Sequence, residues 1–336
     1  MKTIRILCYA LLMCGVVACS SKTEQAPKAD TKAAGAKKQY QIAVIPKGTA
    51  NPFWKTVHAG AAKASKELGV KITWTGPENE DDRKQQMDVV QNFISTGVDA
   101  IVLAPLDDVA LARSVETAVA RKIPVVIIDS DLKSEAQSSF VATDNLEGGC
   151  LGARRLGEVM GGKGKAILLR YNPGSASTDN RERGFLEEMK AKFPNIELVS
   201  TNQYAGVTKE SAIQASQNLL AKYGEDFQGI FCPNESSAFG MLRALEISGK
   251  AGRIKFVGFD ASQGLVDGMK AGNIAGLVAQ DPFDMGYRGV KTAVAVLNGE
   301  TVQKRIPTRL AVITPQNLNT PEIQELIAPE LGKWLD

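Results

Sequence analysis

The chain has 336 residues, of which 44% are hydrophobic and 23% are charged. The part from residue 40 onward, roughly 300 residues, is long for one hydrophobic core and comfortable for two. The 40 basic and 37 acidic side chains nearly cancel. Because no sizeable electrostatic field remains, we expect no nucleic-acid partner.

The first 18 residues are typical of a secretory signal. Lys2 and Arg5 precede an apolar segment, 6–18, that is too short to span a bilayer as a helix. The following VVAC resembles a bacterial lipobox, in which the cysteine becomes the lipidated first residue after cleavage. We therefore predict a signal peptide over 1–18, lipidation of Cys19, and a location in the periplasm or on the outer face of the cell membrane.

Residues 19–39 are rich in Lys, Ala, Gly, Pro and polar side chains, without apolar periodicity. Such a composition is typical of a flexible tether between an anchor and a folded body. We expect the protein to meet the membrane only through its lipid anchor.

From residue 40 onward, short apolar runs alternate with helical segments. The first five runs are QIAVIP, VKITWT, AIVLAP, IPVVIID and SSFVAT, and the helical segments between them are 53–68, 81–96 and 109–122. Met87, Val90 and Ile94 repeat at the spacing of one helix face. Strands that are apolar nearly throughout and separated by helices indicate a parallel sheet covered on both faces.

The same alternation begins again near residue 145. The helical segments are now 145–160, 181–192, 209–222, 238–247, 264–270 and 284–298, and the apolar runs are KAILLR, IELVST, GIFC, IKFVGF, IAGLVAQ and LAVIT. We therefore predict an α/β protein of two similar lobes. The spacing of Cys150 and Cys232 does not argue for a disulfide, and we expect two small buried residues.

Polar residues follow many of these strands. In open parallel α/β sheets, ligands bind beyond the carboxyl ends of the strands. The residues at these places are Asn51, Asp129, Asn234, Asp260 and Gln280, with Arg181 opening a helix and with Phe53, Trp54 and Phe259 beside them. Singly, an Asp or Asn after a strand is more often a helix N-cap, and Asn51 with Pro52 is a good helix start. Their repetition in both halves favours a binding site.

This set of side chains suits a neutral polyol such as a sugar. Carboxylates and amides can bind adjacent hydroxyls, and an arginine supplies a fixed fork of donors. Aromatic rings stack on the apolar faces of a sugar ring. An anionic ligand suits the set less well, because two Asp and one Arg leave it near neutral or negative.

Several segments together resemble a known family. They are NPFW after the first strand, IPVVIID, ATDN, RERGF, NESSAFGMLRAL, VGFD and VAQDPFDMG. The stretch 40–314 is similar to the periplasmic sugar-binding proteins of the ribose and galactose type, the substrate-binding components of ABC importers. The resemblance implies a type I periplasmic binding protein fold, with two Rossmann-like lobes of parallel sheets. It also implies a monomer that binds a monosaccharide and meets an ABC permease.

The resemblance also implies a division of the chain. The lobes would be 40–143 with 281–308, and 144–280 with 309–336, joined by three hinge crossovers near 143–145, 280–282 and 307–309. Carried over by position, the nine residues named above match ligand-contacting positions. Phe53 or Trp54 would cover one face of the sugar ring and Phe259 the other.

The chain departs from the ribose type at three positions. Such members usually carry Asn where this chain has Ala104, and Arg where it has Ser130, and a Phe is replaced near Val207. The identity of the sugar therefore stays open.

Alternatives from other classes can be weighed on the same residues. GEVMGGKG lacks the Ser or Thr of a P-loop and precedes a strand, and His58 is the only histidine. Asp129 and Asp260 could be glycosidase carboxylates, but the amides beside them favour binding over proton transfer. We expect a protein that is not an enzyme, without catalytic residues, metal or cofactor. A sugar-responsive transcriptional regulator would need a DNA-binding segment in front, where this chain has the signal and tether.

One alternative remains open. A sensor lipoprotein that binds a nucleoside or a small signalling molecule would fit the same pattern, and the sequence does not separate sensing from import.

Overall fold

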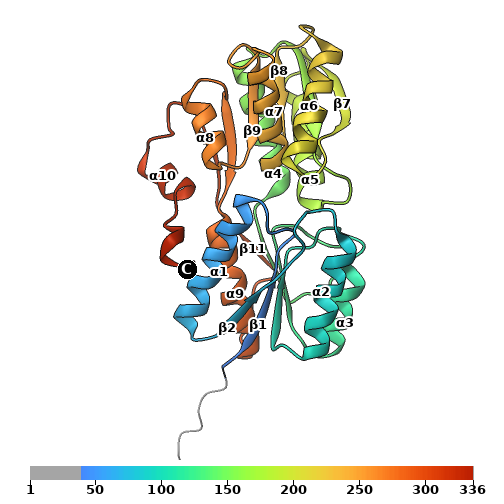
Figure 1. Cartoon of the computed structure of the whole chain (residues 1–336), viewed down its shortest axis with the longest axis vertical. Coiled ribbons are helices and arrows are strands. Elements are labelled where there is room, and N and C mark those ends of the chain that lie inside the picture. The colour runs from blue at the N-terminus through green and yellow to red at the C-terminus, as the bar shows by residue number, and fades with distance from the viewer. Residues whose placement is uncertain (1–38, 336) are drawn as a thin grey trace, which may run out of the picture. The chain divides into compact units, whose positions relative to one another are not determined.

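The computed structural model describes residues 39–335 of the chain (Figure 1). The predicted signal peptide, Cys19 and nearly all of the tether lie outside these residues. Within 39–335, no helix has both the length and the apolar character needed to cross a membrane.

The first lobe is built on a six-stranded parallel sheet with the order β11-β5-β4-β3-β1-β2. Its strands are β1 Gln41–Ile45, β2 Lys71–Trp74, β3 Ala100–Leu103, β4 Val125–Ile128, β5 Ser139–Ala142 and β11 Arg305–Pro307. Helices α1 (Pro52–Leu68) and α9 (Pro282–Leu297) cover one face. The other face packs against α2 (Arg83–Thr96) and α3 (Ala112–Ala120) (Figure 1).

The second lobe repeats this plan, with the strand order β12-β10-β9-β8-β6-β7. Its strands are β6 Gly164–Arg170, β7 Ile196–Tyr204, β8 Gly229–Phe231, β9 Lys255–Phe259, β10 Gly276–Gln280 and β12 Leu310–Ile313, the last of which is antiparallel. Helices α4 (Asn145–Val159) and α5 (Ala176–Lys192) cover one face. The other face carries α6 (Lys209–Tyr223), α7 (Glu235–Ile247) and α8 (Gln263–Lys270). After β12 come α10 (Pro321–Ile327) and a 3₁₀ turn, η1 (Leu331–Lys333).

The chain passes between the two sheets three times. It leaves the first sheet after β5 and enters α4, returns from β10 into α9, and crosses a third time between β11 and β12. The prediction of an α/β fold with two mainly parallel sheets and three crossovers is confirmed.

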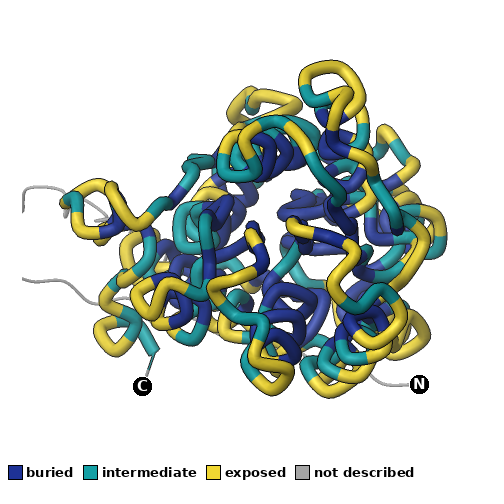
Figure 2. The backbone as a smooth tube through the Cα atoms, turned by 90° about the horizontal axis from the view of Figure 1, so that it is seen from above, coloured by how far each residue is buried: buried dark blue, intermediate teal, exposed yellow. Residues whose placement is uncertain are grey.

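Each sheet is buried on both faces because its strands are apolar on both faces. In β1, Ile42 and Val44 join the cluster under α1 and α9, whereas Ala43 and Ile45 join the cluster under α2 and α3. This alternation follows from the two-residue period of a strand. Figure 2 shows the buried backbone in the interior and the exposed segments at the periphery.

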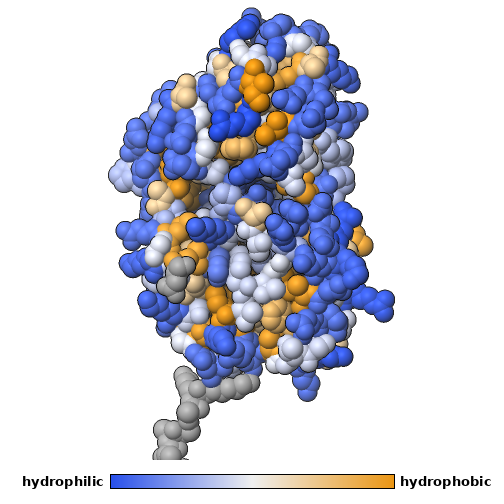
Figure 3. Space-filling view, viewed as in Figure 1, coloured by the Kyte–Doolittle hydropathy of each residue, from blue (hydrophilic) through white to orange (hydrophobic). Residues whose placement is uncertain are grey.

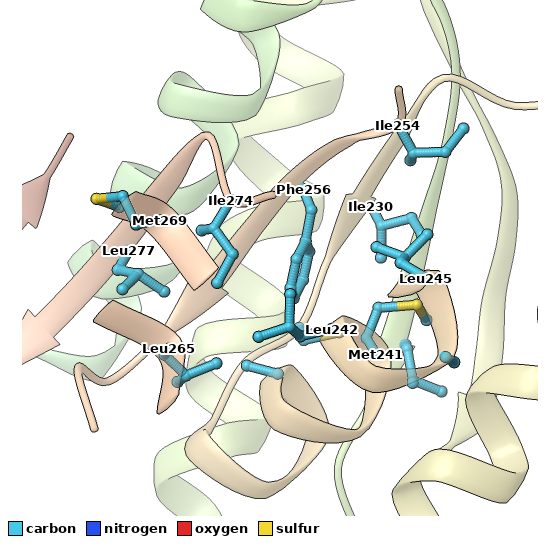
Figure 4. Close-up of a cluster of buried hydrophobic side chains, with 14 of the residues drawn as sticks. Ile230, Met241, Leu242, Leu245, Ile254, Phe256, Leu265, Met269, Ile274 and Leu277 are labelled. Carbon is cyan, nitrogen blue, oxygen red and sulfur yellow. The ribbon is translucent and has the colours of Figure 1, made fainter. Parts of the chain in front are cut away.

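The largest cluster shows how the second lobe is held together (Figure 4). Ile230 and Phe256 come from neighbouring strands, Leu242 comes from α7, and Leu265 and Met269 come from α8. These side chains meet on the face of the sheet opposite α4 and α5. The outer surface seen in Figure 3 is mainly hydrophilic, with scattered apolar residues.

Glycines allow α4 and α5 to approach each other closely. A Cβ atom at Gly149 of α4 would lie 1.9 Å from the carbonyl oxygen of Arg181, and one at Gly184 of α5 would lie 2.1 Å from that of Leu146. Only residues without a side chain fit there. This contact holds the backbone of Arg181 in place.

Some boundaries differ from the sequence prediction. Helix α5 begins at Ala176, so Arg181 lies within the helix and does not open it. The preceding residues are small and polar, and they show no apolar period, although Ser177 and Thr178 are buried. Strand β11 and helix α10 were not predicted, because neither contains an apolar run of its own length.

Cys150 and Cys232 are free thiols. Cys232 is fully buried, as expected, whereas Cys150 is only half-buried and donates to the carbonyl oxygen of Gly184 at 3.5 Å. His58 stacks on the ring of Trp74, and partial burial lowers its pKa, so His58 has a packing role.

Candidate ligand-binding site

A cavity lies between the two lobes, beyond the carboxyl ends of the strands. Its wall consists of Lys47, Asn51, Phe53, Trp54, Glu80, Asp129, Tyr171, Ser175, Ser177, Thr178, Arg181, Asn234, Glu235, Asp260 and Gln280. Eight of the nine predicted site residues are therefore brought together around one cavity; the ninth, Phe259, is not part of the wall.

Asp129 and Asp260 occupy equivalent places in the two lobes. Each directly follows its strand, and their φ angles are 61° and 68°. The backbone N–H of Asp129 donates to the carbonyl of Val141, and that of Asp260 donates to the carbonyl of Val278. A non-glycine residue rarely adopts this left-handed conformation, and such strain clusters at functional sites. The repetition in both lobes supports a role for both carboxylates at the cavity.

The two carboxylates have different partners. Asp129 forms an ion pair with Lys47, with 2.9 Å between Oδ2 and Nζ. Asp260 accepts from the side-chain amide of Gln280 at 2.8 Å and from the backbone N–H of Glu235 at 3.0 Å. Burial raises the pKa of Asp260, and the charge of Arg181 opposes this rise.

Arg181 is 2% exposed and is held from two sides. Its Nε donates to the side chain of Asn145 at 2.9 Å, and its Nη1 donates to the carbonyl of Pro233 at 3.1 Å. Its Nη2 has no hydrogen-bond partner within residues 39–335, although it is buried. Burial lowers the pKa of Arg181. A fixed donor thus remains available at the cavity wall.

Phe259 does not form the second aromatic wall that the sequence led us to expect. Its side chain is 0% exposed and packs in the core between the sheet and α4. The guanidinium carbon of Arg181 lies 3.9 Å from the centroid of its ring. Phe259 is the last residue of β9 and turns toward α4, whereas Asp260 follows the strand with a φ of 68° and lines the cavity. The ring of Phe259 therefore packs against the guanidinium group of Arg181.

The stretch ANPFW places both of its aromatic residues at the cavity. The rings of Phe53 and Trp54 meet edge to face, with their centroids 4.9 Å apart. Trp54 is buried and also belongs to the core of the first lobe, whereas Phe53 is half-buried. The two residues therefore combine the two roles that the sequence left open, core packing and cavity wall.

The two asparagines differ in their relation to the helices that follow them. Asn51 occupies the N-cap position of α1, with Pro52 at N1, but its side chain makes no capping bond and instead donates to Glu80 at 2.6 Å. Asn234 does cap α7, because its side-chain oxygen accepts from the backbone N–H of Ser237 at 3.4 Å. The N-cap interpretation is thus right for the side chain of Asn234 and wrong for that of Asn51.

Glu80 was missed by the sequence analysis. One carboxylate oxygen accepts from Asn51 and from the indole N–H of Trp54 at 2.9 Å. The other accepts from the hydroxyl of Tyr171, across the cleft, at 2.9 Å. Glu80 is one of several acidic residues in the segment GPENEDD, and no local pattern distinguishes it.

Other wall residues could have been suspected from their neighbours. Lys47 comes two residues after β1, and Glu235 directly follows the predicted site residue Asn234. Burial, and after it the nearby charge of Asp260, raises the pKa of Glu235 to about 7. Its carboxylate accepts from the backbone N–H of Phe53 at 3.2 Å, which joins the lobes.

The cavity is polar and rich in acceptors. Four carboxyl groups and two cationic side chains line it. The carbonyl oxygen of the Gln280 side chain, like Nη2 of Arg181, is buried without a partner among the described residues. Buried polar groups are normally satisfied, so this donor and this acceptor suit a neutral ligand with hydroxyl groups. Within 39–335, no group of three or more His, Cys, Asp or Glu residues could hold a metal ion.

Two similar lobes around a polar cavity define a binding protein that encloses its ligand in a cleft. The comparison with known proteins agrees: the chain belongs to the periplasmic binding protein domain family, whose model matches residues 42–301. It is 31% identical over 299 residues to the ribose import binding protein of Bacillus subtilis, which covers 89% of this chain and 94% of that protein.

Solved structures show the same likeness. A solute-binding protein of an ABC transporter from Agrobacterium vitis, with bound D-fucose, is 36% identical with a TM-score of 0.82, over 85% of this chain and 99% of that one. A carbohydrate transporter solute-binding protein from Agrobacterium radiobacter, in complex with D-arabinose, is 33% identical with a TM-score of 0.84, over 87% and 100%. These relatives are binding proteins of transport systems, not enzymes, and the resemblance predicted from the motifs is confirmed.

Proposed function

We propose that this protein captures a monosaccharide in the cavity between its lobes and delivers it to an ABC importer. The observation that carries the proposal is the wall itself, where Asp129 and Asp260 repeat in equivalent places and where Arg181 and Gln280 present a free donor and a free acceptor. Sugar hydroxyls both donate and accept, so they can satisfy carboxylates, amides and a guanidinium at once.

The nine predicted residues enter the proposal with different roles. Asn51, Asp129, Asn234, Asp260, Gln280 and Arg181 are proposed polar contacts, and Phe53 with Trp54 is the proposed aromatic wall. Phe259 acts through Arg181, because its ring lies under the guanidinium group. Relatives are named for ribose, D-allose and xylitol, and solved neighbours hold D-arabinose or D-fucose, so pentoses, hexoses and polyols are the ligands to compare.

We propose that the lobes close on the ligand as units made of 40–143 with 281–308 and of 144–280 with 309–336. The distribution of strands between the two sheets supports this division. The end of the chain departs from it: the ring of Trp334 lies 5.7 Å from Nζ of Lys63, on α1 of the first lobe. Closure satisfies both sets of polar groups at once, which is why ligand would favour the closed state.

The proposed location is outside the cytoplasm, with the protein a monomer held by a lipid on Cys19. Periplasmic relatives and the sequence VVAC support this location. The wild type should incorporate a labelled fatty acid and the Cys19→Ala variant should not, because one sulfur carries the anchor. A Cys19→Ala protein that still takes up the label would refute lipidation at this residue.

A thermal-shift panel tests the sugar proposal. The Cys19→Ala variant, which keeps the whole folded part, would be heated with pentoses, hexoses, polyols and nucleosides in turn. A sugar at one hundred times its dissociation constant should raise the free energy of unfolding by about 2.7 kcal/mol. A shift with nucleosides alone would favour the sensor alternative, and no shift with any sugar or polyol would refute the proposal.

A further inference from the structure

The segment after β6 makes most of the hydrogen bonds that join the lobes. In this segment, residues 171–178, the hydroxyl of Tyr171 donates to Glu80, and the carbonyls of Pro173 and Gly174 accept from Arg83 and from the backbone N–H of Asp108. On the other side of the cavity, the lobes are joined by the bond from Phe53 to Glu235. Lobe contact is therefore concentrated on the 171–178 segment.

Lys47 lies at the centre of this contact. It is 3% exposed, and its ammonium group is 2.9 Å from Asp129 in its own lobe. The same nitrogen is 3.2 Å from Oγ of Ser175 and 3.0 Å from Oγ of Ser177, both in the second lobe. A lysine ammonium has three protons. All three have an acceptor in the protein itself, so none is left over for a ligand.

Burial makes these bonds stronger than a solvent-exposed bond across the cleft, such as that of Arg83 to Pro173. Hydrogen bonds from a charged donor are roughly twice as strong as neutral ones, and water competes little with a group that is enclosed. The backbone N–H of Ser177 also donates to Oγ of Ser130, at 3.0 Å, beside the ammonium group. The bond of Arg83 to Pro173, in contrast, is exposed to solvent. The closed state is thus stabilised by buried hydrogen bonds from a charged group, and these bonds do not involve a ligand.

We infer that Lys47 is a positioning residue that fastens the two lobes together through Ser175 and Ser177. It sets the ratio of closed to open protein before any ligand arrives, and thereby tunes affinity. The effect on affinity rests on the proposed function, whereas the effect on closure does not.

The double variant Ser175→Ala/Ser177→Ala tests the fastening directly. It removes both acceptors of the second lobe and leaves the pair of Lys47 with Asp129 intact. The side chain of Ser175 makes no capping bond to α5, so the helix start should persist. Small-angle X-ray scattering of the ligand-free protein should show a larger radius of gyration for this variant than for the wild type.

A matched control removes two serine hydroxyls away from the cleft. In Ser95→Ala/Ser248→Ala, one serine from each lobe is replaced. Ser95 donates only to a backbone carbonyl of its own helix, and Ser248 donates only to one of the helix that it follows. This control should scatter like the wild type. An unchanged radius of gyration in Ser175→Ala/Ser177→Ala would overturn the inference.

The binding arm uses D-ribose, D-arabinose and D-fucose, measured by calorimetry. Affinity should fall about tenfold in Ser175→Ala/Ser177→Ala and in Lys47→Met, as expected for the loss of charge-assisted bonds. The triple variant Lys47→Met/Ser175→Ala/Ser177→Ala should bind about as well as Lys47→Met alone, because the three side chains form one set of hydrogen bonds, which Lys47→Met already removes. If Lys47 bonded the sugar itself, Lys47→Met would cost the same factor in the serine-free background, and the inference would fail. If the wild type bound none of the three sugars, that would count against the proposed function, while the scattering result would still decide the fastening.

Discussion

Replacement of Arg181 by lysine separates the geometry of the guanidinium group from its charge. The Arg181→Lys variant keeps a cation near Asp260 and Asp129, so no buried carboxylate loses its counter-charge. A single ammonium cannot replace the bonds to Asn145 and Pro233 and also reach into the cavity as Nη2 does. A hydrogen bond of a charged group contributes about 1.5–3 kcal/mol. Loss of the ligand bond should therefore weaken sugar binding roughly 10- to 150-fold.

Isothermal titration calorimetry with the best sugar of the panel would measure this loss, and thermal unfolding of the ligand-free protein would measure stability. Arg155→Lys is the matched control, since Arg155 also makes two hydrogen bonds through its guanidinium group, both to the carbonyl of Ala275, but lies outside the cavity wall. It should lose some stability and no affinity. If Arg181→Lys lost stability but bound sugar as tightly as the wild type, Arg181 would be a structural residue and the proposed contact would be wrong.

Three further predictions test other parts of the site. In Glu80→Gln, at least one of the three groups that now donate to Glu80 loses a well-placed acceptor. Sugar affinity, measured by calorimetry, should therefore fall about tenfold. The control is Glu78→Gln, at an exposed neighbouring position, which should bind sugar normally. Gly149→Ala places a Cβ atom 1.9 Å from a carbonyl oxygen, and urea unfolding should show a loss of about 1–3 kcal/mol, in contrast to Gly332→Ala, where a Cβ meets nothing within 4 Å. The pKa of Glu235 is raised to about 7. The folded protein therefore keeps a proton that the unfolded chain releases near pH 4.5. As a result, the free energy of unfolding should fall by up to about 3 kcal/mol as pH rises from about 5 to 7.5. Glu235→Gln should remove that part of the slope, and an unchanged slope would show that other groups cause it.

Much of the site followed from the order of strands and helices. Because parallel strands end at the same edge of a sheet, the residues after each apolar run, such as Asp129, Asp260 and Gln280, could be expected to meet there. The alternation of strands and helices could be predicted because these strands are apolar on both faces. Whether each asparagine caps its helix could not be predicted, since Asn51 and Asn234 have the same local context and differ only in their hydrogen-bond partners.

The sequence by itself determined the α/β class, the two lobes, the edge where a ligand would sit and the family of binding proteins. These depend on local periodicity and on side chains next to strand ends. Tertiary structure alone decided that Phe259 lies under Arg181, that Glu80 joins Tyr171, and that Lys47 pairs with serines 128 and 130 residues away. The physical reason is that each of these contacts joins residues far apart in the chain, within the second lobe for Phe259 and across the two lobes for Glu80 and Lys47, so no local pattern in the chain records them.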